Sequence, residues 1–347
     1  MIRFDENPLI RPSDVKPSRD DFQVVGAFNA GVTRVGDEIV LLIRIAEAPS
    51  SQDDEVVAPF LRPDRPGGDI EILRVRKDDP ALEAGDPRVF IYKGQPYLTS
   101  MSHLRVARSR DGRHFAIEPR PALVPERPEE EYGIEDPRIT RIGDAYYINY
   151  TAVSRHGIAT ALAVTRDFAT FERKGLIFAV ENRDVTIFPE KVDGKYLCYH
   201  RPVTSGFGGP DIWLARSPDL VHWGEHVRVC GRRAGLWDGW KIGGGAVPIK
   251  TDRGWLEIYH GADETQRYTL GLLLTELDEP HKIIARSRSP ILEPVADYER
   301  EGFFHDVVFT CGALADPDGR VLIYYGTADQ YTAGAETSVH DLLATLV

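Results

Sequence analysis

Short, strand-like runs that recur along the whole chain limit what it can fold into more than any other feature. Runs of about five to ten residues rich in Val, Ile, Leu, Tyr and Phe follow Gly-Asp, Asp-Gly or Pro turn signals, as at 36–45, 143–150 and 194–199. No segment keeps a hydrophobic period of three to four residues for more than about two turns, so long helices are not expected. The pattern predicts an all-β fold.

The runs also recur as larger units of about three or four strands, at a spacing of about fifty to sixty residues. About six such units can be counted by eye. They begin near Asn29, Asp86, Asp136, Asp184, Gly243 and Val307. This period is typical of a β-propeller and too strand-rich for a helical solenoid. The two units before Asp136 could instead form one blade with an inserted hairpin, and the polar segment 49–66 is interpreted as an inserted loop.

Length and composition favour a single globular domain. With 347 residues and 42% hydrophobic content, we expect one domain over 1–347, in which 1–21 is an extended lead-in. The net charge of -12 argues against a nucleic-acid or anionic-membrane partner. No apolar signal core and no run of transmembrane length is found, so the cytoplasm is the expected location.

Neither cysteines nor histidines predict a metal centre. No zinc or redox spacing links the cysteines, which are Cys198, Cys230 and Cys311. Buried small apolar residues are the simpler interpretation of these three. No pair at helical ligand spacing occurs among His156, His200, His260 and His305. We therefore expect no metal.

Polar and charged residues gather at the starts of the units. In a propeller the innermost strands line the central axis, so residues at their starts converge from different blades. These residues are Asn29, Asp86, Arg88, Glu135, Asp136, Arg138, Arg183, Asp184, Glu190, Lys191, Lys241, His305 and Asp306. Carboxylates accept hydrogen bonds from sugar hydroxyls, and an acid can protonate a glycosidic oxygen, so the set favours sugar chemistry.

Asp136, in the stretch Gly133-Ile134-Glu135-Asp136-Pro137-Arg138, is the candidate catalytic acid. Two adjacent carboxyls in one pocket raise each other's pKa, so Glu135 would help to hold one of them protonated. An Asp followed by Pro-Arg can also serve only to cap a turn. That structural interpretation is the stronger one for Asp86 and the weaker one for Asp136.

Arg183, Arg201 and Lys241 form a second, cationic group. Arginine binds phosphate through two parallel hydrogen bonds and lysine adds a point charge, although a surface salt bridge is the alternative for each. The glycines at 243–245 lack the strand-to-helix setting of a P-loop and are interpreted as allowing an inner strand to pack tightly. Beside them, Trp237 or Trp240 either packs within a blade or stacks on a sugar ring.

Several motifs together resemble glycoside hydrolase family 130, the β-mannoside phosphorylases and related β-mannosidases. Besides 133–138, they are Phe188-Pro189-Glu190-Lys191, His200-Arg201-Pro202, 217–224, Lys241-Ile242-Gly243-Gly244-Gly245, 254–261, 307–312 and 323–326. The resemblance runs from near Phe28 to the C-terminus. So many motifs in the same order make a chance match implausible.

The resemblance implies a five-bladed propeller and an inverting reaction at a β-mannosidic bond, with Asp136 as the acid acting directly or through a sugar hydroxyl. In the phosphorylases of the family, inorganic phosphate attacks the anomeric carbon from the opposite face and gives α-mannose 1-phosphate. The implied phosphate-binding residues are Arg183, Arg201, Lys241 and Tyr268. The residues assigned to sugar binding are Asn29, Arg44, Asp86, Glu135, Asp184, Glu190, His305 and Asp306.

The predicted function is inverting phosphorolysis of β-1,2-linked mannobiose or a mannooligosaccharide, with phosphate as co-substrate and no cofactor. The alternative is an inverting β-1,2-mannosidase, which needs a carboxylate about 6.5–9.5 Å from the acid to activate water. The candidate bases are Asp211, Asp238 and Asp306. A non-catalytic binding propeller is a remote third interpretation, because it leaves the charged strand starts unexplained. Homo-oligomer formation stays open.

Overall fold

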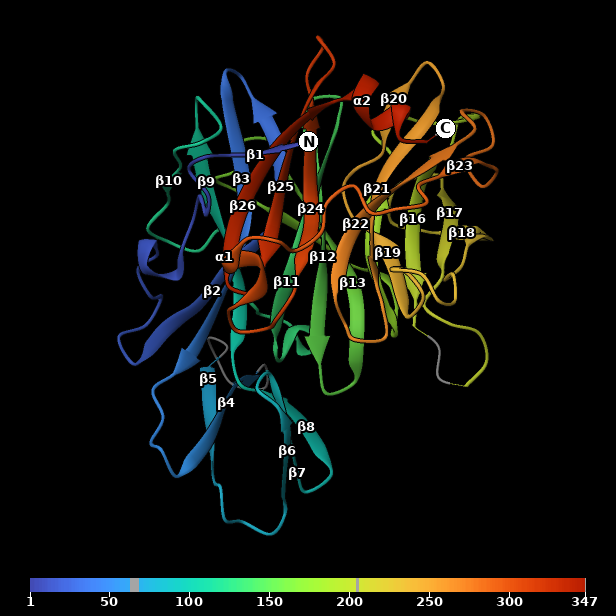
Figure 1. The fold of residues 1–347 in the computed structure, drawn as a ribbon. Helices are drawn as coiled ribbons and strands as arrows, with labels where there is room; N and C mark the ends of the chain where they lie inside the picture. Colours follow the sequence, from blue (N-terminus) through green and yellow to red (C-terminus); the bar gives the residue numbers. More distant parts are fainter. Residues whose placement is uncertain (63–68, 204–205, 347) are drawn as a thin grey trace.

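The computed structural model describes residues 1–62, 69–203 and 206–346, with the side chains of 84–86 left aside, and it is built almost wholly of strands (Figure 1). The helical elements in these ranges are 3₁₀ helices η1 (Pro12–Asp14) and η2 (Pro128–Glu130) and α-helices α1 (Asp297–Arg300) and α2 (Val339–Ala344). None of the helices described is long and apolar enough to span a membrane. The predicted all-β fold is confirmed.

One four-stranded sheet joins the two ends of the chain. Its strands are β24 (Val308–Ala315), β25 (Arg320–Thr327), β26 (Tyr331–Ser338) and β1 (Ile2–Arg3), in the order β1-β26-β25-β24. Strand β1 pairs with the last strand, so that Ile2 lies opposite Glu336. The lead-in expected over 1–21 therefore contributes a strand to the sheet at the C-terminal end.

Two further sheets follow the chain order without crossovers. The first contains β15 (Asn182–Ile187), β16 (Tyr196–Pro202), β17 (Ile212–Ser217) and β18 (Gly224–Cys230). The second contains β19 (Lys241–Gly244), β21 (Gly254–Ala262), β22 (Tyr268–Thr275) and β23 (Ile283–Arg286), with β20 (Ile249–Thr251) on β21. Consecutive strands pair antiparallel, as the short turns between them require.

The largest sheet has eight strands in two halves. One half contains β2 (Phe22–Val35), β3 (Glu38–Pro49), β9 (Met101–Ser109) and β10 (Ala116–Ile117). The other contains β11 (Gly133–Ile142), β12 (Ala145–Ser154), β13 (Gly157–Thr165) and β14 (Glu172–Phe178). A single parallel register pair, Gly133 with Ser102, connects the halves.

The chain between β3 and β9 forms an insertion. It contains the hairpin β4 (Glu55–Arg62) and β5 (Asp69–Arg76), and the three-stranded sheet β6 (Leu82–Asp86), β7 (Val89–Tyr92) and β8 (Gln95–Leu98), which project at the bottom of Figure 1. Strands β3 and β9 pair directly with each other. The unit expected near Asp86 is thus an insertion within the first unit. The loop expected over 49–66 is wrong for 55–62, which form β4, while 63–66 lie outside the described residues.

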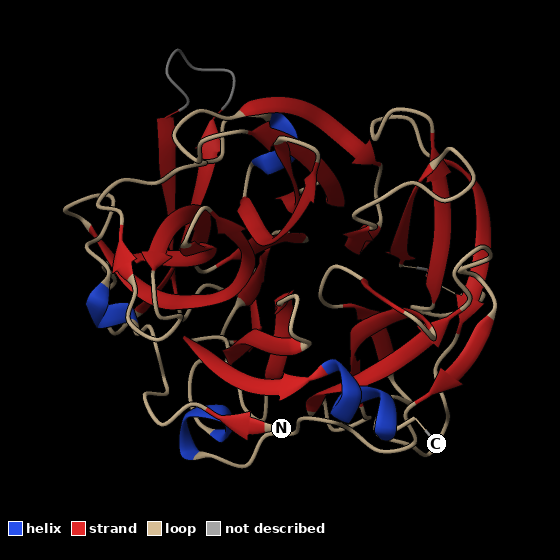
Figure 2. Cartoon of the chain, turned by 90° about the horizontal axis from the view of Figure 1, so that it is seen from above, coloured by secondary structure: helices blue, strands red, loops and turns tan. Residues whose placement is uncertain are grey.

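Buried apolar residues fill the spaces between neighbouring sheets, which lie around a common centre in Figure 2. One cluster joins β3 to β25, a second joins β3 and β9 to β12, and a third joins β13 to β15. A fourth joins β16 to β21, and a fifth joins β22 to β25. Along β3, Leu41 and Ile43 belong to one cluster and Val40 and Leu42 to another, because successive side chains point to opposite faces.

Three strands carry a bulge at a polar residue. Register shifts in β2, β11 and β15 lie beside Asn29, Asp136 and Asp184, whose φ angles are 51°, 50° and 56°. Left-handed backbone costs about 1–3 kcal/mol in a non-glycine residue, and Asn and Asp tolerate it best. A bulge re-aims the side chain it carries. In each strand, the bulge thus directs one polar side chain away from the regular alternation of side chains between the two faces of the sheet.

Candidate active site

The side chains of the three bulges meet in one pocket with a volume of about 330 Å³. Strands β2, β3, β11, β15, β16, β19, β21 and β22 each contribute to its lining. The predicted residues found in this lining are Asn29, Arg44, Arg88, Glu135, Asp136, Arg183, Asp184, Arg201, Lys241 and Tyr268. The fold therefore brings together residues from most of the length of the chain.

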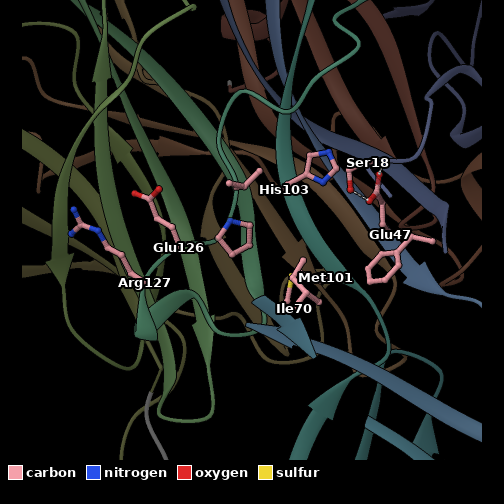
Figure 3. Close-up of a pocket in the computed structure, with 10 residues that line it drawn as sticks. Ser18, Glu47, Ile70, Met101, His103, Glu126 and Arg127 are labelled. Carbon is pink, nitrogen blue, oxygen red and sulfur yellow. Dashed lines mark hydrogen bonds between the residues drawn. The ribbon is translucent and has the colours of Figure 1, made fainter. Parts of the chain in front are cut away.

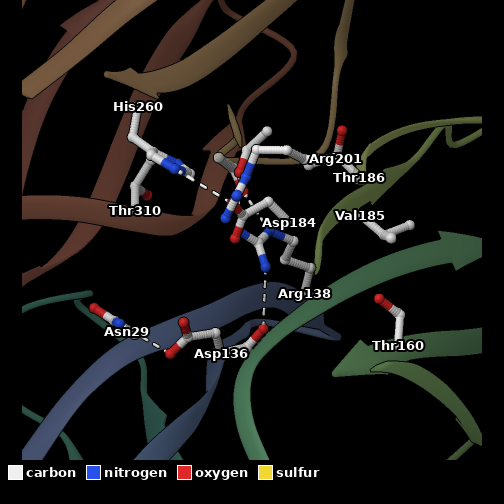
Figure 4. A network of polar contacts seen from close by, with 12 residues as sticks. Asn29, Asp136, Arg138, Thr160, Asp184, Val185, Thr186, Arg201, His260 and Thr310 are labelled. Atoms are coloured by element: carbon white, nitrogen blue, oxygen red, sulfur yellow. Dashed lines mark hydrogen bonds and ion pairs between the residues drawn. The ribbon is translucent and has the colours of Figure 1, made fainter. Parts of the chain in front are cut away.

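One side of the pocket holds two carboxylates. Asn29 Nδ2 donates to Asp136 Oδ1 over 2.9 Å (Figure 4), and Arg44 Nη1 donates to the same oxygen over 3.1 Å. Arg44 also donates to Glu135 Oε1 over 2.8 Å and to Ser102 Oγ over 3.0 Å. Both hydrogen bonds to Asp136 use Oδ1, so Oδ2 has no partner among the described residues.

Burial shapes the protonation of this side. It raises the pKa of Glu135, and the neighbouring charge of Asp136 adds to the rise against the attraction of Arg44. It also raises the pKa of Asp329, another carboxyl in the lining. Burial alone would lower the pKa of Arg44, but Glu135 and Asp136 outweigh it and the pKa is raised. Glu135 and Asp329 therefore retain a proton to a higher pH than free carboxyls do.

A buried arginine beneath the pocket links its two sides. Arg138 Nε donates to Gly245 O and Nη2 to Gly244 O, both over 2.8 Å, while Nη1 donates to Asp136 O over 3.2 Å. Nη2 also lies 3.5 Å from Asp184 Oδ1 (Figure 4). A Cβ at Gly245 would lie 2.3 Å from a backbone oxygen, which confirms that these glycines allow tight packing.

The other side of the pocket holds cations around Asp184. Arg201 Nε donates to Asp184 Oδ2 over 2.7 Å, and His260 Nε2 lies 3.3 Å from the same oxygen (Figure 4). Burial alone would raise the pKa of Asp184, but the charges of Arg201, His260 and Arg138 hold it well below its usual range. Asp184 is therefore an anion that balances the charge of one buried arginine.

Arg183 and Lys241 add positive charge, and neither forms an ion pair with a carboxylate among the described residues. Lys241 Nζ donates to Tyr268 Oη over 3.0 Å, and Arg183 Nε is buried with no hydrogen-bond partner among the described residues. Burial, followed by the charges of Arg201 and Arg183, lowers the pKa of Lys241 to about 7. Buried cations that lack counter-ions are costly, and an anionic ligand would relieve that cost.

Asp329 is a pocket residue that the sequence did not predict. It lies 3.3 Å from Arg88 Nη1, and Arg88 lies over the Phe304 ring at 4.0 Å. Asp329 follows strand β25, whereas only strand starts were searched, and a search of strand ends would have found it. Of the two tryptophans considered for stacking, Trp240 lines the pocket and Trp237 does not.

The remaining predicted residues lie elsewhere. Glu190 pairs with Lys250 outside the pocket lining, because β15 has already ended before this motif. His305 is exposed, and neither His305 nor Asp306 is in the lining. The side chain of Asp86 lies outside the described residues.

The carboxylates considered as hydrolytic bases also lie outside the lining. Asp211 accepts a hydrogen bond from Arg228 Nε over 2.7 Å. Asp238 is fully buried between Arg233 and Arg286. Across the described ranges, no group of three or more His, Cys, Asp or Glu side chains is placed to hold a metal ion.

Known proteins share the family and the fold. The model of glycoside hydrolase family 130, described as beta-1,4-mannooligosaccharide phosphorylase, matches residues 81–347. The beta-1,2-mannobiose phosphorylase of Listeria innocua is 48% identical over 348 residues, covering 99% of this chain and 97% of that protein. A 1,2-beta-oligomannan phosphorylase of Thermoanaerobacter sp. is 38% identical, covering 71% of this chain and 82% of that protein.

The structural comparison agrees. The solved structure of the Listeria innocua beta-1,2-mannobiose phosphorylase, in complex with beta-1,2-mannobiose, matches with a TM-score of 0.96 at 46% identity. The match covers 99% of this chain and 98% of that one. The resemblance inferred from the motifs is confirmed, and the chain belongs to glycoside hydrolase family 130.

Proposed function

We propose that this protein cleaves β-1,2-linked mannobiose, or a short β-mannooligosaccharide, with inorganic phosphate and inversion, giving α-mannose 1-phosphate. The family and the 48% identical relative support the reaction and the linkage. The observation that carries the proposal is the division of the pocket between the Asp136 carboxyl and the cations Arg183 and Lys241. Phosphorolysis needs both an acid for the leaving sugar and an anion site for the nucleophile.

Asp136 is the general acid in this mechanism. Its proton passes to the glycosidic oxygen, directly or through a sugar hydroxyl, while the bond from that oxygen to the anomeric carbon breaks. Asn29 and Arg44 hold Oδ1, which leaves Oδ2 for the transfer. A phosphate oxygen forms the new bond to the anomeric carbon from the opposite face, so the configuration inverts.

The cationic side is the proposed phosphate site. Arg201 engages Asp184 through Nε and Nη2, which fixes the plane of the guanidinium and leaves Nη1 without a partner among the described residues. Arg183 and Lys241 supply the charge, and Tyr268 supplies a hydroxyl beside Lys241. A phosphate dianion placed here would compensate Arg183 and Lys241, which form no ion pair within the described part of the chain.

The sugar is proposed to bind at the carboxylate side. Glu135 and Asp329, whose pKa values are raised by burial, and Asn29 and Arg44 offer donors and acceptors to its hydroxyls. Hydrolysis is less well supported, because an inverting hydrolase needs a base opposite the acid. Each base considered from the sequence lies outside the lining.

We also propose that the chain is a single domain with the form of a five-bladed propeller. The eight-stranded sheet would supply two blades, since one residue pair connects its halves, and three other sheets would supply one each. The hydrophobic clusters support this arrangement, because they link the sheets in succession and the last returns to β25. Strands β4 to β8 would then be an insertion within the first blade.

We propose that the reaction takes place in the cytoplasm, with phosphate as co-substrate and no further cofactor. Cys198, Cys230 and Cys311 are free and buried, which suits a reducing compartment.

Product analysis on β-1,2-mannobiose, with and without inorganic phosphate, tests the function. We expect α-mannose 1-phosphate and free mannose in equal amounts, and only when phosphate is present. Free mannose formed at the same rate in both reactions would make the enzyme a hydrolase. No turnover in either would reject β-1,2-mannobiose as the substrate.

A further inference from the structure

A second cavity lies against the other face of strands β3 and β9 (Figure 3). Its volume is about 570 Å³. This rear cavity is lined by Ser18, Phe22, Glu47, Ile70, Met101 and His103, with 124–127 also in its lining. Along β3, Ala46 faces the candidate active site and Glu47 faces the rear cavity, because side chains alternate between the faces of a strand. The two cavities therefore share strands but no lining residue.

One part of the rear cavity carries fixed polar groups. Glu47, 2% exposed, accepts hydrogen bonds from Ser18 N over 2.8 Å and from Ser18 Oγ (Figure 3). His103, 5% exposed, accepts at Nε2 from Arg105 Nη2 over 3.3 Å, so a neutral ring carries its proton on Nδ1. Nδ1 has no partner among the described residues. Because His103 lines the rear cavity, this is a donor that a ligand there can use.

The charges of Glu47 and Arg105 balance each other, and the other charged residues of the lining, Glu126 and Arg127, are opposite in sign. Arg105, 1% exposed, lies 4.0 Å from Glu47 Oε1 and compensates its charge. Burial, assisted by Arg105, lowers the pKa of His103 to about 3, so the imidazole is neutral near pH 7. Each Glu47 oxygen accepts one hydrogen bond and keeps acceptor capacity for another. This set suits a neutral ligand rich in hydroxyls better than an ion.

Apolar side chains complete the cavity. Phe22, Ile70 and Met101 give it an apolar wall, and small-molecule sites typically combine such walls with a few placed polar groups in about 300–1,000 Å³. A pyranose ring has one apolar C–H face for Phe22 and adjacent hydroxyls for Glu47 and His103. We propose that the rear cavity is a second sugar-binding site, which takes a neutral pyranose and is separate from the active site.

The rear cavity lies beside Ser102, a residue that holds Arg44, which is a hydrogen-bond partner of the proposed acid Asp136. Met101 and His103 flank Ser102, whose Oγ accepts from Arg44 Nε and whose backbone pairs with Gly133 at the start of β11. Arg44 in turn donates to Asp136. A sugar in the rear cavity would thus contact Met101 and His103. These are the two neighbours of Ser102, which accepts the hydrogen bond from Arg44.

Calorimetric titration of mannose, without phosphate, tests the proposal. Ile70→Trp places an indole in the rear cavity without removing Glu47, Ser18 or His103. We expect this variant to bind one mannose fewer per chain than the wild type. Leu176→Trp is the matched control, because Leu176 is 38% exposed on β14 and lines neither cavity. It should keep the wild-type stoichiometry.

The variant His103→Phe and a crystal soak provide two further, independent tests of sugar binding in the rear cavity. His103→Phe keeps an aromatic ring and removes the Nδ1 donor, so it should weaken the same binding event about tenfold, the cost of about one hydrogen bond. Wild-type crystals soaked in mannose should show a ring in contact with Glu47 and His103. Equal stoichiometry in the wild type and Ile70→Trp, or an empty rear cavity after the soak, would overturn the proposal, whatever the outcome of the phosphorolysis assay.

Discussion

At the scale of single residues, Asp136 is held at one carboxylate oxygen and free at the other. Asn29 and Arg44 donate to Oδ1 and orient the group, while Oδ2 has no partner among the described residues. An acid that must release its proton and regain it at each turnover benefits from this asymmetry, since one oxygen fixes the geometry and the other exchanges the proton.

Asp136→Asn tests this division of roles. The variant keeps an acceptor oxygen for Asn29 and loses the transferable proton. We expect turnover of β-1,2-mannobiose to fall by about 10²–10⁴-fold, the usual contribution of a general acid. The thermal unfolding midpoint, measured by calorimetry, should stay near that of the wild type. Near-full activity would remove Asp136 from the role of acid.

Variants of Arg183 and Arg201 should differ in their effect on stability, although both change the proposed phosphate site. Arg183→Gln removes a cation with no ion pair among the described residues, so the KM for phosphate should rise about ten- to a hundredfold. The KM for mannobiose and the free energy of unfolding should change little. Arg201→Gln also breaks a buried ion pair and leaves Asp184 with the more distant Arg138, so we expect a cost of about 3–5 kcal/mol of stability. Similar unfolding curves for the two variants would contradict this distinction.

Lys241 should make phosphate binding depend on pH. Burial lowers its pKa to about 7, so the cation is present below that pH and lost above it. Because phosphate binds to the protonated form, the KM for phosphate should rise by up to about tenfold per pH unit above neutrality. Lys241→Met is the control. It should raise the KM for phosphate at low pH and remove the dependence of this KM on pH. A wild-type KM that stays flat from about pH 6 to pH 9 would count against the role.

At the scale of elements, turn signals predicted strands well, and composition predicted one segment wrongly. The Gly-Asp turn at 36–37 lies between β2 and β3, as expected. The segment 55–62 is a strand despite its polar, Pro-containing surroundings, because β5 pairs along its whole length and tertiary context outweighs local propensity. Glu190 was expected at a strand start, yet it follows the end of β15 and therefore misses the pocket.

Close packing between β19 and its neighbours gives a test at this scale. Gly245→Ala would place a Cβ 2.3 Å from Ile258 O, so we expect a loss of about 1–3 kcal/mol in the free energy of unfolding. Gly224→Ala is the matched control, since a Cβ there meets no atom within 4 Å. Its effect should stay within about 0.5 kcal/mol. Urea denaturation measures both, and equal losses would contradict the packing argument.

At the scale of the whole molecule, the sequence predicted which residues come together better than it predicted the contacts among them. Residues at the starts of successive units converge on one pocket, as the repeated pattern suggested. The contacts among them depend on bulges and on glycine packing, which no local pattern specifies. Arg88, which was predicted at a unit start, also lines the pocket, together with Val89 and Leu98 of the insertion. No sequence pattern predicted that Val89 and Leu98 would reach the pocket.

The left-handed bulges at Asn29, Asp136 and Asp184 also affect how such a protein can evolve. Glycine would relax the backbone at each of them, but at Asp184 it would also leave Arg201 and Arg138 without their buried counter-ion. At Asn29 and Asp136, the substitution that relieves backbone strain deletes a side chain that we propose to be functional. Selection for catalysis and selection for stability therefore act in opposite directions at the same codons. A lineage that no longer needed the reaction would be expected to drift toward glycine at Asn29 and Asp136 first, while its hydrophobic clusters stayed unchanged.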